Sequence, residues 1–258
     1  MILDNIVKKT KERVDLLKKE KPLESLKEES KGCNKKKNFY EALKKDEMAF
    51  IMEVKRASPS KGVIAEDFNY LEIAKEYEKI GASAVSVLTE PYFFKGKNEY
   101  LQEISESINL PILRKDFIVD KYQIYESKLI GADGILLICA ILEEKQLMEY
   151  LDLARKLKLD VLVETHNEKE IQMALKAKAR IIGVNNRNLE DFTVDINNSV
   201  RLRKLVPKDL IYISESGIET RKDIQKLEEN NIDAVLIGEF FMKAKNKNKV
   251  FNTIRGIK

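Results

Sequence analysis

Short apolar runs alternate with longer segments of helical periodicity along most of the chain. Eight such runs lie between about residues 48 and 238, and most are continuous in Val, Ile and Leu. They are Phe50–Val54, Ala84–Leu88, Ile112–Leu113, Gly134–Ile138, Val161–Val163, Ile181–Val184, Leu210–Ser214 and Ala234–Ile237. Continuous apolar strands separated by helices are typical of parallel βα units whose strands are covered on both faces. We therefore expect eight parallel strands.

A weak internal repeat marks the same succession of elements. Four short segments, each at the end of a helical stretch and leading into the next strand, start about 50 residues apart, or two βα units. They are Gly81–Val85, Gly131–Ile135, Lys178–Ile182 and Asn231–Val235. This spacing suits a closed barrel or an open doubly wound sheet. Eight strands in 258 residues favour an α/β fold with a single (β/α)8 (TIM) barrel, for which ~250 residues are typical.

The segment before the first strand is longer than a barrel requires. Apolar residues recur in it at helical spacing, namely Leu3, Ile6, Val7, Val14 and Leu17. This pattern predicts an amphipathic helix packed on the barrel. The polar stretch Glu28–Asn38 is predicted to be a mobile connection. We therefore expect one domain, with a helical extension over residues 1–46 and a barrel over residues 47–258.

The composition is that of an ordinary globular chain, with 43% hydrophobic and 35% charged residues. The 47 basic residues nearly balance the 43 acidic ones. Basic runs such as Lys35–Lys37 are short, which predicts a solvated loop rather than a nucleic-acid-binding face. No stretch approaches the ~18 apolar residues of a membrane helix, and the amino terminus lacks the apolar run of a secretion signal. We expect a cytoplasmic monomer with neither a nucleic-acid nor a membrane partner.

The two cysteines, Cys33 and Cys139, lie far apart and form no CxxC pair. This spacing predicts neither a disulfide framework nor a zinc site. Cys139 ends an apolar run, so we expect it to be a small buried hydrophobic residue.

Ionisable residues stand at the carboxyl ends of several predicted strands. In the first strand, Ile51, Glu53 and Lys55 share one face, because side chains alternate between the barrel interior and the helix ring. Later strands end in further polar residues: Lys115 and Asp116, Glu164, Asn185 and Arg187, and Glu215. Buried charges cost several kcal/mol each unless they are paired, so any single one could belong to an ion-pair network at the rim. As a set at the face that carries barrel active sites, they predict a catalytic centre.

Glycines occur in the last two strand-to-helix loops. Ser214–Ile218 follows the seventh predicted strand, and Gly238 with Glu239 follows the eighth. In barrels these two loops commonly form a phosphate site with the amino terminus of a short helix. A glycine has no Cβ, so backbone N–H groups can approach an anion closely. We therefore predict a phosphorylated small-molecule substrate.

One long motif adds a specific resemblance. Glu53–Gly62, which reads Glu-Val-Lys-Arg-Ala-Ser-Pro-Ser-Lys-Gly, closely resembles the signature of the indole-3-glycerol-phosphate synthase family. Further motifs similar to those of the family follow in order: Leu88–Glu90, Leu113–Phe117, Val163–His166, Gly183–Leu189, Ser214–Ile218 and Leu236–Glu239. Ile2–Ile6 and Phe39–Leu43 look like the extra helices of this family, so the similarity covers nearly the whole chain.

The resemblance implies a carboxy-lyase of tryptophan biosynthesis that needs no metal or organic cofactor. It would close the ring of 1-(o-carboxyphenylamino)-1-deoxyribulose 5-phosphate to indole-3-glycerol phosphate, with loss of carbon dioxide and water. By carry-over, Lys115 is the general acid at the carbonyl oxygen, and Glu164 is an acid or base in the dehydration. Glu53 supports Glu164, and Lys55 clamps the substrate carboxylate or donates a second proton. A desolvated lysine near cations can have a lowered pKa, which would suit Lys115 to this task.

The same carry-over assigns other residues to the surroundings of the substrate. Asn185 and Glu215 would orient the catalytic groups, Arg187, Ser58 and Phe117 would bind the substrate, and Ser216, Gly217, Gly238 and Glu239 would surround the phosphate. Glu239 stands where some family members carry serine, which is tolerable if the backbone N–H binds the phosphate. Asn186 also departs from the serine frequent at its position.

Two aromatic residues and the single histidine have open roles. His166 follows Glu164 closely, which invites a catalytic role. A loop or rim position beside the site is favoured, because the lysines already supply proton transfer. Phe93 and Phe94 could stack on the anthranilate ring or serve ordinary packing.

Three alternatives compete with this function. A sister phosphate-binding barrel such as phosphoribosylanthranilate isomerase would use a cysteine and aspartate pair, and the first strand has no cysteine. A Schiff-base aldolase could use Lys55 or Lys115 as its amine. A catalytically inactive, lysine-rich scaffold is opposed by the intact set of Lys55, Lys115, Glu164 and Glu215.

Overall fold

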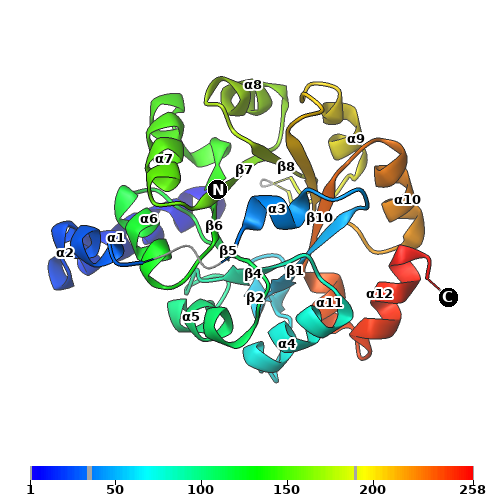
Figure 1. The fold of residues 1–258 in the computed structure, drawn as a ribbon, viewed down its shortest axis with the longest axis horizontal. Coiled ribbons are helices and arrows are strands. Elements are labelled where there is room, and N and C mark those ends of the chain that lie inside the picture. Colours follow the sequence, from blue (N-terminus) through cyan, green and yellow to red (C-terminus); the bar gives the residue numbers. More distant parts are fainter. Residues whose placement is uncertain (1, 34–36, 189–190, 258) are drawn as a thin grey trace.

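The computed structural model describes residues 2–33, 37–188 and 191–257. Its centre is a closed barrel of parallel strands, each hydrogen-bonded to the next around the ring (Figure 1). In ring order these strands are β1 (Ala49–Val54), β4 (Ala84–Leu88), β5 (Ile112–Lys115), β6 (Gly134–Ile138), β7 (Asp160–Thr165), β8 (Ile181–Asn185), β9 (Ile211–Glu215) and β10 (Ala234–Ile237). Each predicted apolar run overlaps one strand, and the predicted barrel fold is confirmed.

Several strands extend past the predicted runs to include the polar residues at their carboxyl ends. Lys115 is the last residue of β5 and is paired in register with Leu88 of β4. Asn185 and Glu215 end β8 and β9 and face each other in the ladder. The backbone of these residues is therefore fixed by the sheet rather than by a loop.

Helices surround the barrel on its outside (Figure 1). They are α4 (Tyr70–Ile80), α5 (Asn98–Ser107), α6 (Lys121–Leu129), the 3-10 turn η1 (Cys139–Ile141), α7 (Glu144–Lys156), α8 (Glu168–Lys176), α9 (Asn197–Arg203), α10 (Arg221–Glu229), α11 (Glu239–Lys243) and α12 (Lys247–Arg255). Polar side chains cap many of their amino termini; Asn167, for example, accepts a hydrogen bond from the Glu170 N–H at the start of α8. A short antiparallel pair, β2 (Ala57–Ser58) and β3 (Gly62–Val63), follows β1.

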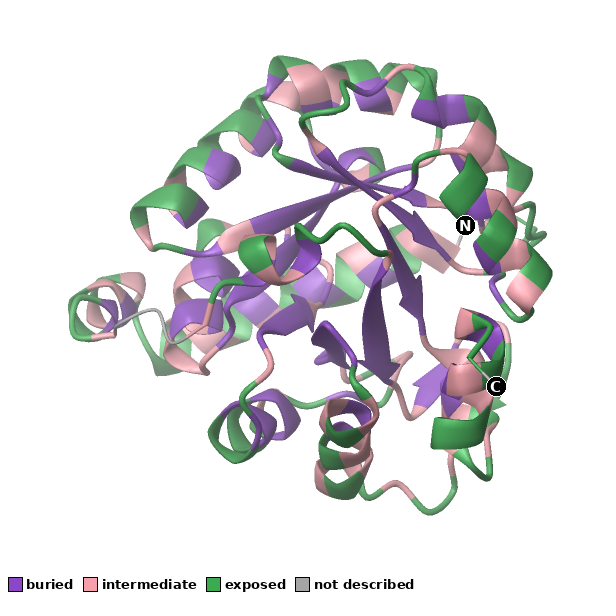
Figure 2. Cartoon of the chain, turned by 45° about the vertical axis from the view of Figure 1, so that its right-hand side comes forward, coloured by how far each residue is buried: buried purple, intermediate pink, exposed green. Residues whose placement is uncertain are grey.

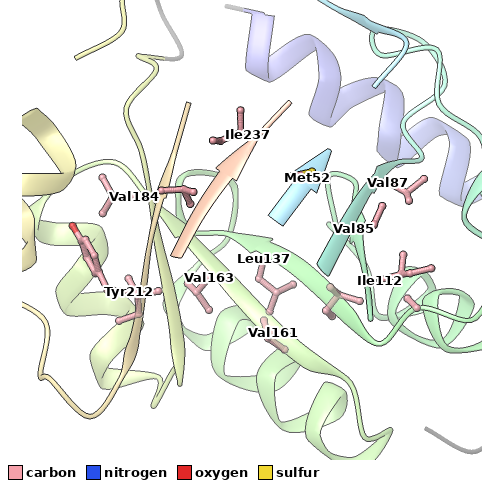
Figure 3. Close-up of a cluster of buried hydrophobic side chains, with 14 of the residues drawn as sticks. Met52, Val85, Val87, Ile112, Leu137, Val161, Val163, Val184, Tyr212 and Ile237 are labelled. Atoms are coloured by element: carbon pink, nitrogen blue, oxygen red, sulfur yellow. The ribbon is translucent and has the colours of Figure 1, made fainter. Parts of the chain in front are cut away.

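The barrel strands are buried except for one half-buried end residue in each of β5, β7 and β8, whereas the helices alternate between buried and exposed faces (Figure 2). Ile51 belongs to the apolar cluster inside the barrel. Met52 and Val54 belong to the cluster between the strands and the helices, where Met52 lies with outward-facing residues of other strands (Figure 3). The predicted alternation in β1 is therefore confirmed, and it directs Glu53 inward.

Within residues 2–33 and 37–48, three helices precede the barrel. They are α1 (Ile2–Glu20), α2 (Leu23–Ser30) and α3 (Phe39–Leu43). Val14 of α1 and Leu26 of α2 pack on Tyr122 of α6. In Figure 1, α3 lies across the centre of the ring of strands, and its Phe39 and Leu43 join the inner apolar cluster. The amphipathic helix predicted at the amino terminus is confirmed.

The polar stretch between α2 and α3 differs from its prediction as a mobile connection. Its first residues, Glu28–Ser30, form the last turn of α2, and Asn38 caps α3. Lys35 and Lys36 lie outside the described residues. The Nζ of Lys37 donates to the carbonyl oxygens of Ser105 and Ile108 at 3.0 and 2.7 Å. Lys37 is half-buried, so its prediction as part of a solvated loop is wrong.

The predicted burial of Cys139 is confirmed, and burial raises the pKa of its thiol to about 12. Across the described helices, none is long and apolar enough to cross a membrane.

Candidate active site

Four alternate strands each place one ionisable side chain in the barrel interior near its carboxyl end. These are Glu53 of β1, Lys115 of β5, Glu164 of β7 and Glu215 of β9. Alternate strands supply the side chains of one layer in such a barrel. The three carboxylates are buried, and the lysine side chain is 15% exposed. We call these four residues the charged layer.

Ion pairs connect the members of the charged layer. The Nζ of Lys115 lies 2.9 Å from Oε2 of Glu164 and 3.6 Å from Oε2 of Glu215. The Nζ of Lys55, just beyond β1, lies 2.7 Å from Oε1 of Glu53. Asn185 donates from Nδ2 to Oε1 of Glu164 at 3.4 Å. Residues far apart in the chain thus converge on one centre.

The carboxylates control the protonation of Lys115. Burial acts to lower its pKa, but the charges of Glu164, Glu215 and Glu53 outweigh burial and raise the pKa above its ordinary value. The prediction of a lowered pKa is wrong for the free enzyme, because the nearest charges are anions and not cations. Lys115 therefore carries its proton at neutral pH.

The two carboxylates beside Lys115 differ in their protonation. Burial acts to raise the pKa of Glu164, but Lys115 and His166 outweigh it and lower the pKa. Burial raises the pKa of Glu215 to about 8, against the opposing charge of Lys115. One carboxylate is thus ionised and the other largely protonated at neutral pH, which gives the layer both a base and an acid.

Gly183 of β8 makes room for Glu215. A Cβ at this position would lie 2.2 Å from Oε1 of Glu215 and 2.9 Å from Cδ1 of Leu162. Neither side chain can retreat far, because both are buried in the barrel. The absence of a side chain at Gly183 therefore sets the position of the Glu215 carboxylate.

Replacing Gly183 by alanine is expected to lower kcat about tenfold or more, because Glu215 must move away from Lys115. The overpacking should also reduce the free energy of unfolding by about 1–3 kcal/mol. Steady-state kinetics and urea unfolding measure the two effects. Gly32→Ala is the control, since a Cβ there meets no atom closer than 3.8 Å. A Gly183→Ala variant as active as the parent would contradict this role.

The loop after β9 has unusual backbone geometry. Ser216 and Gly217 are consecutive residues with positive φ, at 70° and 78°. A non-glycine residue in this region is strained, and such strain gathers at ligand sites.

Gly238, predicted to let backbone N–H groups approach an anion, has a second role. A Cβ on it would lie 2.4 Å from Oε1 of Glu53 and 3.0 Å from Nζ of Lys55.

Glu239 begins α11, and its side chain turns aside to pair with Lys243. Burial acts to raise the pKa of Glu239, but Lys243, Lys61 and Lys55 outweigh it and lower the pKa. An ionised carboxylate repels a phosphate, so only the backbone of Glu239 is suited to bind one.

One cavity of about 580 Å³ opens above the charged layer. Every residue assigned to the site from the sequence lines it: Glu53, Lys55, Ser58, Lys115, Phe117, Glu164, Asn185, Arg187, Glu215, Ser216, Gly217, Gly238 and Glu239. The structure brings these residues together, while their individual roles stay predictions.

Sequence reasoning missed part of the apolar lining. Ile2, Leu3 and Ile6 of α1 line the cavity, and so does Phe192. Phe94, which the sequence offered for stacking or packing, also lines the cavity. The helical stripe in α1 was a signal for Leu3 and Ile6 but not for Ile2, and it does not show where the helix lies. Phe94 packs near Phe117, with ring centroids 6.0 Å apart.

Asp116 belongs to a structural ion-pair network, which was the alternative to a catalytic role for charges at strand ends. Its carboxylate lies 2.9 Å from Arg13 of α1 and 3.1 Å from Arg114, and it accepts a hydrogen bond from Thr89 at 2.8 Å. Burial acts to raise the pKa of Asp116, but Arg13 and Arg114 outweigh it and lower the pKa. This buried network ties α1 to β5 beside Lys115.

His166 lies beside the site, on the outer side of Glu164. Its Nε2 is 3.5 Å from Oε1 of Glu164, and its Nδ1 is 3.0 Å from Oε2 of Glu170.

Within residues 2–33, 37–188 and 191–257, no three or more His, Cys, Asp or Glu side chains are arranged to hold a metal ion.

Comparison with known proteins gives the same family as the sequence motif. The family model described as "Indole-3-glycerol phosphate synthase" matches residues 3–254. A protein of that name from Endomicrobium trichonymphae is 58% identical over 249 residues, covering 95% of this chain and 96% of its own. Another from Ruminiclostridium cellulolyticum is 52% identical over 258 residues, covering 99% of each chain.

Solved structures with little sequence similarity share the fold. The 3-hexulose-6-phosphate synthase of Salmonella typhimurium has a TM-score of 0.66 at 13% identity, covering 81% of this chain and 97% of its own. The thiamine phosphate pyrophosphorylase of Pyrococcus furiosus has a TM-score of 0.61 at 14% identity, covering 85% and 96%. At these identities the likeness concerns the fold alone.

Proposed function

Because the chain belongs to the indole-3-glycerol phosphate synthase family, we propose that its charged layer closes the indole ring of the product. The enzyme is a carboxy-lyase of tryptophan biosynthesis, and its substrate is 1-(o-carboxyphenylamino)-1-deoxyribulose 5-phosphate. The ion pair of Lys115 with Glu164 at 2.9 Å is the observation that carries our assignment of roles. It supports the assignment of Lys115 as a proton donor and Glu164 as its partner at the base of one cavity.

Lys115 is the proton donor to the carbonyl oxygen of the substrate. The surrounding carboxylates keep Lys115 protonated before the reaction. As the ring carbon attacks the carbonyl carbon, the oxygen develops alkoxide character and becomes a strong base. A proton can then pass to it even from a lysine of raised pKa, since the basicity of the acceptor rises during the step.

Glu164 takes part in the dehydration that follows the loss of carbon dioxide. Water leaves with a proton from an acid on one side of the new ring, and the adjacent CH2 loses a proton to a base on the other side. Glu164 provides one of these two functions. Its contacts with Lys115 and Asn185 hold the carboxylate in place, and Glu53 and Glu215 complete the charge balance around it.

The remaining assigned residues bind the substrate. Lys55, at the rim of the cavity, clamps the substrate carboxylate or donates a second proton. Asn185 orients Glu164, and Arg187, Ser58 and Phe117 shape the pocket. Ser216, Gly217, Gly238 and Glu239 bind the phosphate through their backbone. The consecutive positive φ angles in the loop after β9 support this part of the proposal.

The test is direct turnover of the carboxyphenylamino substrate, followed by the fluorescence of the indole product and by release of carbon dioxide. We expect both to appear together. A substrate analogue without the 5-phosphate should show a KM raised about 100-fold or more. Borohydride added during turnover should trap no lysine, because ring closure forms no imine. Absence of indole product, or a trapped lysine, would overturn the proposal.

We further propose a cytoplasmic monomer with no nucleic-acid partner, in which residues 1–46 extend one barrel domain over residues 47–258. The near balance of 47 basic and 43 acidic residues supports the absence of nucleic-acid binding. The proposed proton transfers use side chains only and call for no metal or organic cofactor.

A further inference from the structure

His166 is positioned with one ring nitrogen directed at the site. It follows the last residue of β7, and its backbone carbonyl accepts a hydrogen bond from Asn198 of α9 at 3.1 Å. The Nδ1 is 3.0 Å from Oε2 of Glu170 in the first turn of α8. The Nε2 is buried, has no hydrogen-bond partner among the described residues, and faces Oε1 of Glu164 at 3.5 Å.

This histidine stands between two cavities. Glu164 lines the cavity above the charged layer, whereas His166 and Glu170 line a second cavity of about 600 Å³. Leu3, Asn185 and Arg187 line both cavities and so form the wall between them. The contact between His166 and Glu164 therefore joins the second cavity to the first.

The overall reaction must import one proton. In ring closure, the ring carbon bonds to the carbonyl carbon and the carbonyl oxygen gains one proton. The bond to the carboxylate then breaks, and its electrons restore the aromatic ring as carbon dioxide leaves. In dehydration, the hydroxyl gains a second proton and leaves as water, while the adjacent CH2 gives one up. Two protons enter and one returns, so each turnover consumes one proton from solvent.

That proton cannot easily arrive through the first cavity while the substrate fills it. The acidic and basic groups of the charged layer lie at its base, and apolar residues of α1, including Ile2 and Ile6, line its walls. The second cavity is not part of the proposed substrate site. It leaves a route for a proton behind the substrate.

We propose that His166 supplies Glu164, from the second cavity, with the proton that each turnover consumes. The Nε2–H gives its proton to the Glu164 carboxylate, and the neutral ring keeps its Nδ1 proton. The ring then turns about its Cβ–Cγ bond until Nε2 reaches water in the second cavity, which His166 also lines, regains one proton there and turns back. This inference rests on the proposed role of Glu164. His166 itself touches no substrate atom and acts through that carboxylate.

The surrounding charges favour this function. Burial acts to lower the pKa of His166, but Glu170, Glu164 and Glu215 outweigh it and raise the pKa above the ordinary 6.5. These carboxylates come from α8, β7 and β9. On the side of the second cavity, α9 presents the neutral Asn198 and the cationic Arg201, and Arg187 and Asp195 also line that cavity. Proton supply is present below the raised pKa of His166 and is lost as the pH rises through it.

The pH profile of kcat tests the inference. Glu170→Gln removes a carboxylate that raises the His166 pKa, so the alkaline limb of kcat should move to lower pH. Glu168→Gln is the matched control, because Glu168 lies in the same turn of α8 but pairs with Arg201 instead. Glu215 titrates in the same range, but neither substitution touches it. An unmoved limb in Glu170→Gln, or an equal shift in both variants, would overturn the inference.

His166→Gln gives a second test, since glutamine keeps an N–H donor toward Glu164 but cannot be recharged with a proton. We expect kcat at neutral pH to fall about tenfold or more, with KM within about twofold, and the limb that moves in Glu170→Gln to be absent. Unchanged kcat, or a loss equal at every pH, excludes proton supply. Full activity of Glu164→Gln would instead refute the proposed role of Glu164, so the two failures are distinguishable.

Discussion

Lys115→Met is expected to lower kcat by about 1,000-fold or more while the barrel still folds. Methionine fills similar space but can neither donate a proton nor pair with carboxylates. The substitution leaves Glu164 and Glu215 without the cation that lies 2.9 and 3.6 Å from them. Both should become protonated more readily, which limits the cost of leaving them buried. Indole fluorescence measures kcat, and circular dichroism with urea unfolding measures the fold.

The control for this variant is Lys121→Met, at the exposed start of α6. The same change of residue type there should leave kcat within about twofold of the parent. If Lys115→Met also kept kcat within a few-fold, the lysine would not be the proton donor. If it failed to fold, Lys115→Arg keeps the charge and should fold, yet it should remain severely impaired because arginine does not release its proton.

Glu164→Gln is the second substitution expected to have a large effect. It should lower kcat at least about 100-fold. Glutamine keeps an oxygen for the hydrogen bond from Asn185 but neither takes up nor releases a proton. Because the pKa of Glu164 is lowered in the folded chain, its carboxylate is ionised above the ordinary pKa of 4.5. The stability that this ionised group contributes is lost only as the pH falls through the lowered pKa.

The turnover rate and the pH dependence of the free energy of unfolding therefore both report on Glu164. In Glu164→Gln, the part of the acid destabilisation that belongs to this group should be absent, and Lys115 should lose a carboxylate that raises its pKa. Glu144→Gln, at the start of α7, controls for the loss of a solvent-accessible carboxylate, since the Glu144 side chain is 42% exposed and pairs with Lys176. Activity of Glu164→Gln close to that of the parent would show that another group performs its chemistry.

Much of the fold follows from local pattern. Continuous apolar runs predict parallel strands because a strand covered on both faces has no polar side. The alternation within β1 places Ile51 and Glu53 on the inner face without any knowledge of the neighbouring strands. The same alternation, applied at each strand end, gathers the site residues at one cavity. These predictions need only the period of a strand and the rule for where barrel active sites lie.

Contacts across the barrel could not be predicted in the same way. The raised pKa of Lys115 depends on which side chains reach it from β7 and β9, and strand order alone does not give side-chain distances. The role of Gly238 beside Lys55 and Glu53 likewise depends on close packing between β10 and β1. The position of His166 behind Glu164 likewise depends on where α8 begins, because Glu170 in its first turn orients the His166 ring. The half-buried Lys37 depends on carbonyls more than 60 residues away along the chain.

The bond between Arg13 and Asp116 joins residues 103 positions apart, which matters for how the chain is made. The ribosome releases α1 first, and at about 5–20 residues per second the partner of Arg13 follows some 5–20 seconds later. Until then the apolar stripe of α1 can pack on Leu26 of α2 but not on Tyr122 of α6. The charged residues along the rest of that helix keep the nascent segment in water, so the entrance to the pocket is completed late in synthesis although its helix is translated first.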